Sequence, residues 1–200
     1  MQSRMKLYSY IVKKDKGLAP NPFWGWCTLA LCTPNHMGIK ANQSDWIVGF
    51  TNAARGNKLV FGMEVLQRIH FNDYIKDPRF QRKKPVMDGT WRQRCGDNIY
   101  WQDEEKWCQL NSPYHFSKKD LRKDTKHPYV FVSRYFFYFG ENAIPVPPEF
   151  NTIIWKKQGC KYNHAPEDVR NFLEWLQQNY SPGRHGEPMD GEMDSKGCTN

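Results

Sequence analysis

Only one stretch of this sequence has the periodicity of a long helix, and that limits the folds open to it. Pro166 suits the first turn of such a helix. The apolar face that follows it is formed by Val169, Phe172, Leu173 and Leu176. Other apolar residues form short runs bounded by turn-forming residues, which is typical of strands. We expect strands at residues 6–12, 26–32, 46–50, 58–68 and 129–139, and a short helix between Asn72 and Pro78. This combination predicts an α+β fold with few helices, built on a strongly curved mixed β-sheet or a small β-barrel.

The segment from Pro78 to Pro128 lacks clear periodicity, yet it is rich in aromatic rings. These rings are Phe80, Trp91, Tyr100, Trp101, Trp107 and Tyr114. Each buried ring contributes on the order of 2 kcal/mol, enough together to order the segment. We expect a long ordered insertion at residues 78–128 that forms one wall of a ligand pocket. The alternative is a flap that only packs against the rest of the fold and has a basic outer surface. The segment belongs to a single domain at residues 1–183, followed by an acidic, frayed tail at 184–200.

Basic residues are concentrated in the middle of the chain. Lysine and arginine total 29 against 21 aspartate and glutamate, a formal net charge of +8. Seven of these cations lie within residues 76–94. Because phosphates are attracted to such a cluster, we predict that Arg79, Lys83 and Lys84 contact a nucleic-acid backbone. The alternatives are a solvated basic loop and a loop that binds an acidic protein.

Motifs for several catalytic chemistries are missing from the sequence. It has no GxxxxGK[ST] phosphate loop, no HExxH zinc motif, no GxSxG nucleophile elbow and no HxE…PCxxC deaminase pattern. Its six cysteines form no CxxC pair, so we predict no metal site, and no motif indicates a cofactor. No apolar run is long enough to cross a bilayer and the first residues do not resemble a secretory signal, so we expect a cytoplasmic protein without membrane contact.

Residues that could hold a nucleotide gather in two kinds of place. The loop at 21–26 presents aromatic rings, which stack on bases; closing one end of the barrel is the alternative role. The pairs Asp45-Trp46 and Asp97-Asn98 lie at expected strand ends, where polar groups can read a base edge or simply form turns. The predicted ligand-binding residues are Tyr10, Asn21, Phe23, Trp24, Trp26, Asp45, Trp46, Asp97, Asn98, Tyr100 and Ser133.

Several long motifs occur in the same order as in one known family. They are MKLYSYIV, APNPFWGWCTLALC, SDWIVGF, DPRFQRKKPVMDG, GDNIY and LRKDT…VFVSRYFFYFG. From about Met5 to about Gly186 the chain resembles the nucleotide modification associated domain 2 family. Ser44 departs from the family pattern, in which glycine precedes Asp-Trp, and the Trp24/Trp26 pair is more aromatic than usual. The DWIVG and KLVFGMEV strands are similar, more loosely, to PUA-like and EVE-type barrels.

The resemblance implies a role with nucleic acid. Members of the family occur in bacteria and phages near enzymes that hypermodify DNA bases, which makes such DNA-modification enzymes expected partners. We therefore expect a PUA-like domain that binds DNA or a nucleotide carrying a modified or flipped base. The alternative is an enzyme that acts on a nucleotide or DNA base, with Asp45, Asp97 and Asp124 as acid–base groups and Cys27 as a nucleophile.

Overall fold

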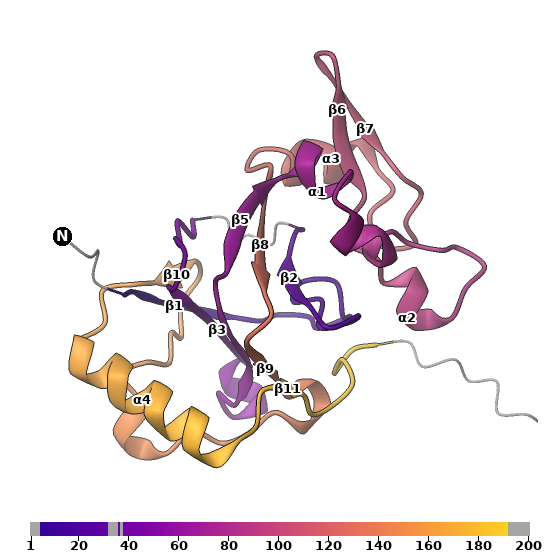
Figure 1. The fold of residues 1–200 in the computed structure, drawn as a ribbon. Coiled ribbons are helices and arrows are strands. Elements are labelled where there is room, and N and C mark those ends of the chain that lie inside the picture. Colours follow the sequence, from indigo (N-terminus) through magenta and orange to yellow (C-terminus); the bar gives the residue numbers. More distant parts are fainter. Residues whose placement is uncertain (1–4, 32–35, 37, 192–200) are drawn as a thin grey trace, which may run out of the picture.

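The structure is a computed structural model that describes residues 5–31, 36 and 38–191, and its architecture is mixed α+β (Figure 1). The largest sheet has six strands in the order β10-β1-β3-β4-β9-β11. They are β1 (Leu7–Ile11), β3 (Trp46–Phe50), β4 (Leu59–Glu64), β9 (Phe136–Tyr138), β10 (Cys160–Lys161) and β11 (Gly183–Arg184). The pairs β1–β3 and β9–β11 are parallel and the others antiparallel, so the sheet is mixed.

A second sheet has three antiparallel strands in the order β2-β8-β5. These are β2 (Cys27–Leu29), β5 (Gln67–His70) and β8 (Tyr129–Ser133). Two short corners join strands of the two sheets, one from β4 into β5 and the other from β8 into β9. The sheets of the described residues do not close into a barrel, so the small barrel that we considered is not confirmed.

Two hydrophobic cores hold the two sheets and the long helix α4 (Pro166–Asn179) together. Helix α4 packs its apolar face, including Leu176, against Trp46 and Phe137 of the six-stranded sheet. Gly62 in β4 permits this packing, because an added Cβ would lie 3.3 Å from a Leu176 methyl group. The other core brings residues of both sheets together, among them Phe61. Every helix in the described part of the chain is too short or too polar to cross a bilayer.

The segment at residues 78–128 contains regular structure that its sequence does not predict. A 3₁₀ turn at Pro78–Lys83 follows α1 (Phe71–Tyr74), and further along come α2 (Trp91–Arg94), β6 (Tyr100–Asp103), β7 (Lys106–Gln109) and α3 (Lys118–Asp124). The β6–β7 hairpin projects away from the six-stranded sheet (Figure 1). Of the six rings, Phe80 and Tyr100 are fully buried and the others partly exposed.

Two of the expected strands are each divided between the sheets. The strand predicted at 58–68 is β4 and β5, and the strand predicted at 129–139 is β8 and β9. At the second corner the Ser133 hydroxyl donates to the Tyr135 carbonyl at 2.8 Å, a local bond that competes with strand pairing. The corner leaves Arg134 and Tyr135 exposed, although we expected a doubly buried strand there.

The other element boundaries differ by a few residues. The strand predicted at 46–50 is confirmed as β3, whereas β2 is shorter than the predicted strand, whose last residue, Cys32, lies outside the described residues. Helix α1 begins at Phe71, and its cap is the His70 ring, which accepts from the Asn72 amide at 3.2 Å, where we expected Asn72 itself.

The C-terminal strap, residues 183–191, is ordered where we expected a frayed tail from 184 onward. Its first two residues pair with β9 as β11. The backbone amides of His185 and Asp190 donate to the carbonyls of Tyr138 at 2.7 Å and Asp15 at 2.8 Å. The rest of the predicted tail, residues 192–200, lies outside the described residues.

Candidate functional site

The aromatic loop is held in a tight turn at residues 23–26. The Trp26 amide donates to the Phe23 carbonyl at 3.3 Å, and the central residues, Trp24 and Gly25, have φ angles of 62° and 76°. Two positive φ angles are typical of a type I′ turn. For an L residue such as Trp24 this conformation costs about 1–2 kcal/mol, and such strain is concentrated at functional sites.

A groove of about 540 Å³ lies beside this turn. Its walls are residues 22–25, the β8–β9 corner at 134–136, residues 182–184 and Arg92. We call it the arginine groove, because Arg92, Arg134 and Arg184 all line it. Its volume lies in the usual range for small-molecule sites.

Aromatic rings pack against guanidinium groups in two pairs, and one member of each pair, Arg134 or Trp24, lines the groove. The Arg134 guanidinium carbon lies 4.8 Å from the centre of the Trp26 ring, and that of Arg82 lies 4.1 Å from the centre of the Trp24 ring. Such cation–π contacts hold the cations in place without neutralising them. Trp24 is half-buried and Tyr135 is 37% exposed, so both rings can be reached from solvent. The groove therefore combines positive charge with accessible aromatic rings.

Beneath the turn, Lys83 is fully buried, and its ammonium shares three hydrogens among four acceptors. These are the backbone and side-chain carbonyls of Asn21 at 2.8 and 2.7 Å, the Trp26 carbonyl at 2.9 Å and the Thr28 hydroxyl at 3.1 Å. We predicted that Lys83 contacts a phosphate, but a buried ammonium with these acceptors instead holds the aromatic turn in position.

Asp97 lies on the other side of the same Thr28 hydroxyl, which donates to its carboxylate, as does Tyr74 at 2.8 Å. Burial lowers the pKa of Lys83 to about 8 and raises the pKa of Asp97, while the attraction between the two charges opposes both shifts. Cys27, also fully buried, has its pKa raised by burial to about 12. A thiol with that pKa is not a thiolate at neutral pH, which argues against the predicted nucleophile.

The remaining predicted ligand-binding residues do not line the groove. They are Tyr10, Asn21, Trp26, Asp45, Trp46, Asp97, Asn98, Tyr100 and Ser133, all of them buried. The Asp45 carboxylate accepts from the amides of Lys6 and Asn42, both at 2.8 Å, and so supports a turn. The Asn98 amide donates to the carbonyls of Tyr74 and Phe80 at 3.0 and 3.1 Å. Only Phe23 and Trp24 of the predicted set line the groove directly.

Two predicted phosphate contacts, Arg79 and Lys84, lie at the surface of the segment at 78–128, outside the groove. The Arg79 guanidinium forms an ion pair with Asp77 at 2.6 Å. Lys84 is half-buried and lines a separate hollow with Lys76 and Trp101. Sequence reasoning missed the groove arginines because they come from three distant segments. For Arg134 the sequence did contain an indication of a special role. Ser133 and Arg134 are the only polar residues that interrupt the apolar run at 129–139.

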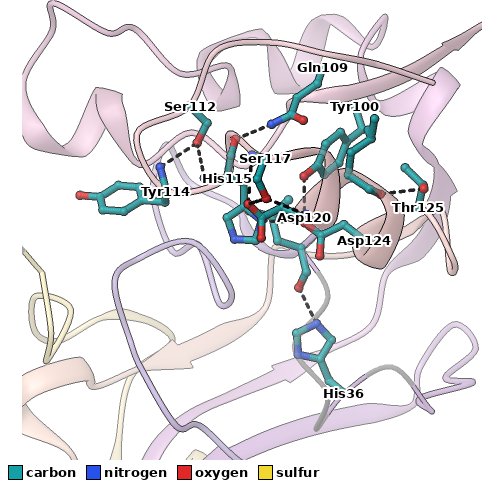
Figure 2. Close-up of polar contacts among 12 residues, drawn as sticks. His36, Tyr100, Gln109, Ser112, Tyr114, His115, Ser117, Asp120, Asp124 and Thr125 are labelled. Carbon is teal, nitrogen blue, oxygen red and sulfur yellow. Dashed lines mark hydrogen bonds and ion pairs between the residues drawn. The ribbon is translucent and has the colours of Figure 1, made fainter. Parts of the chain in front are cut away.

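Asp124, the last candidate catalytic residue, belongs to a second polar cluster (Figure 2). Its carboxylate lies 2.6 Å from Nδ1 of His115 and accepts from the Tyr100 hydroxyl at 2.9 Å. Asp124 is fully buried, whereas the His115 side chain is 20% exposed. A buried carboxylate that orients a partly exposed imidazole can support proton transfer. His36 lies nearby, and burial lowers its pKa to about 4.

Among the described residues, no three histidine, cysteine, aspartate or glutamate side chains are grouped so that they could hold a metal ion.

Comparison with known proteins gives one clear relationship. No curated protein and no solved structure matches the chain. The family model for nucleotide modification associated domain 2 matches residues 4–195, nearly the whole chain. The chain therefore belongs to the nucleotide modification associated domain 2 family.

Proposed function

We propose that the arginine groove binds one nucleotide, whose base is modified or flipped out of a DNA duplex. The observation that carries this proposal is the convergence of Arg92, Arg134 and Arg184 on a groove whose wall includes accessible rings of Trp24 and Tyr135. Guanidinium groups bind phosphate in a bidentate manner, and aromatic faces stack on bases of any sequence. The family name connects the chain with nucleotide modification, which supports DNA or a nucleotide as the ligand and DNA-modification enzymes as partners.

Binding of short DNA strands with modified and plain bases, at one stated salt concentration, tests the proposal. We expect tighter binding of a modified base. In the variant Arg134→Gln we expect binding to weaken about tenfold, the usual effect of losing one charge-assisted hydrogen bond. The matched control is Arg170→Gln on the exposed side of α4, which removes the same charge outside the groove.

Each part of the proposal can fail separately. Equal affinity for modified and plain DNA would contradict recognition of a modified base. Equal losses in Arg134→Gln and Arg170→Gln would show that binding depends on overall charge, and would contradict the groove as the site.

A second candidate function is catalysis on a nucleotide, and the 2.6 Å contact between His115 and Asp124 favours it. In this role the imidazole would accept a proton from a substrate hydroxyl or water while Asp124 orients the ring. Mass spectrometry of nucleotides incubated with the protein tests this candidate. A product formed by the wild type and lost in His115→Gln supports it, and the absence of any product contradicts it.

A further inference from the structure

The carboxylate of Glu187 lies between two arginines of the arginine groove. Its Oε1 atom accepts from an Nη atom of Arg92 at 2.6 Å and also from Arg184. Glu187 belongs to the C-terminal strap and is separated from Arg92 by 95 positions in the sequence. One carboxylate oxygen therefore serves two guanidinium groups.

This carboxylate does not satisfy all the polar atoms around it. Among the described residues, Oε2 of Glu187 and Nε of Arg92 are buried and have no hydrogen-bond partner. A buried polar atom without a partner costs about 1–3 kcal/mol, so the carboxylate is a poor fit to these arginines. A phosphate group carries more oxygens, which could accept from both guanidinium groups and from Nε of Arg92 together.

The charge of the groove points to the same ligand group. Arg92, Arg134 and Arg184 line the groove, and Glu187 offsets one of their three positive charges. A phosphate monoester carries a charge of about −1.5 to −2 at neutral pH, which complements the full set better than one carboxylate does. The Arg184 guanidinium carbon lies 5.8 Å from the centre of the Phe23 ring, so this cation is held beside the aromatic turn.

We infer that Glu187 occupies the phosphate subsite of the arginine groove, and that the phosphate of a bound nucleotide displaces the Glu187 side chain from Arg92 and Arg184. This inference rests on the proposed function and deepens it by assigning the group that the two arginines bind. The strap backbone can stay in place during this exchange. The Glu187 carbonyl accepts from the Glu141 amide at 2.7 Å, and the Glu187 amide donates to the Glu141 carboxylate at 3.3 Å, without the side chain of Glu187.

The variant Glu187→Gln tests the inference, with Glu105→Gln as its matched control. Both remove one negative charge, but Glu105 is exposed and lies at the turn of the β6–β7 hairpin, away from the strap (Figure 1). The probes are a nucleoside, its 5′-monophosphate and a short single-stranded oligonucleotide. We expect Glu187→Gln to bind a phosphate-bearing probe about tenfold more tightly than the wild type and to bind the nucleoside unchanged. A melting curve of each variant confirms that it is folded.

The pattern of gains identifies the source of the phosphate. A gain for the monophosphate alone indicates a free nucleotide, and a gain for the oligonucleotide alone indicates a strand; both support the subsite. The further change Arg184→Gln should cancel the gain.

Four results overturn the inference. An equal gain for the nucleoside or in Glu105→Gln would show an effect unrelated to phosphate at this place. Binding of nucleotides with equal affinity by wild type and Glu187→Gln would overturn the subsite and leave the proposed function intact. No binding of any probe by either protein would overturn both.

Discussion

Lys83 donates hydrogen bonds to both carbonyl oxygens of Asn21, at 2.8 Å to the backbone and 2.7 Å to the side chain. Asn21 in turn donates from its amide to the Cys95 carbonyl at 2.8 Å. Lys83 and Cys95 belong to the segment at 78–128, whereas Asn21 begins the aromatic loop at 21–26, which contains the turn. These bonds therefore tie the segment at 78–128 to the aromatic loop, and a buried ammonium positions the aromatic wall of the groove.

Replacing Lys83 should destabilise the fold far more than replacing its neighbour. Lys83→Met keeps the aliphatic stem but removes a charged donor from the oxygens of Asn21 and Trp26 and leaves Asp97 without a nearby cation. Removal of one member of a buried charged cluster costs about 3–5 kcal/mol. We expect a loss of that size in the free energy of unfolding, measured by urea denaturation.

Lys84→Met is the matched control, because Lys84 is half-buried at the surface and forms no ion pair within the described part of the chain. We expect it to change the free energy of unfolding by less than about 1 kcal/mol. If the two variants unfold at the same urea concentration, the buried ammonium does not hold the turn.

Elements that depend on local pattern could be predicted from the sequence. Strand β3 is apolar throughout, and α4 has a clean apolar face after Pro166, so burial alone defines them. The division of residues 129–139 between two sheets could not be predicted. An apolar run shows that a strand is buried, but it does not show which sheet the strand joins.

The site was predicted only in part, for a similar reason. The residue types of the 21–26 loop marked it as a place for base stacking, and Phe23 and Trp24 do line the groove. The arginines of the groove come from positions 92, 134 and 184, and nothing local relates these positions. Lys83 was assigned to phosphate because charge in a sequence does not reveal burial, and its acceptors lie 55 to 62 positions away.

Ser44→Gly should stabilise the protein. The φ angle of Ser44 is 69°, in the region that favours glycine. Relief of this conformation should raise the free energy of unfolding by about 1 kcal/mol. The neighbouring change Gln43→Gly should lower it, because the φ angle of Gln43 is not positive and glycine adds freedom to the unfolded chain. Urea denaturation that ranks the two variants in the opposite order would contradict this account.

Trp24→Gly should separate ligand binding from stability. Glycine tolerates the φ angle of 62°, so we expect no loss in melting temperature. Loss of the stacking ring should weaken nucleotide binding by about 1–3 kcal/mol, the usual contribution of one stacked base. Affinity for DNA at fixed salt, measured together with the melting temperature of the same variant, checks this prediction.

Trp155→Ala provides the comparison, because Trp155 is half-buried and does not line the groove. We expect unchanged affinity for DNA in this variant. Unchanged affinity in Trp24→Gly as well would remove the aromatic turn from the proposed site.

Asp15 should make the stability of the protein depend on pH in an unusual direction. Its carboxyl is buried, accepts from the Tyr138 hydroxyl at 2.7 Å, and has its pKa raised by burial to about 6. Between pH 4 and pH 6 the folded state therefore holds a proton that the unfolded state releases, and the stability due to this proton is lost as pH rises through 6. The difference in unfolding free energy between wild type and Asp15→Asn should fall by up to about 3 kcal/mol from pH 4 to pH 7.

Because the asparagine in the variant does not titrate, this difference isolates the Asp15 carboxyl from all other titrating groups. Urea denaturation at each pH measures it, and a difference that stays constant or rises with pH would show that burial does not control this group.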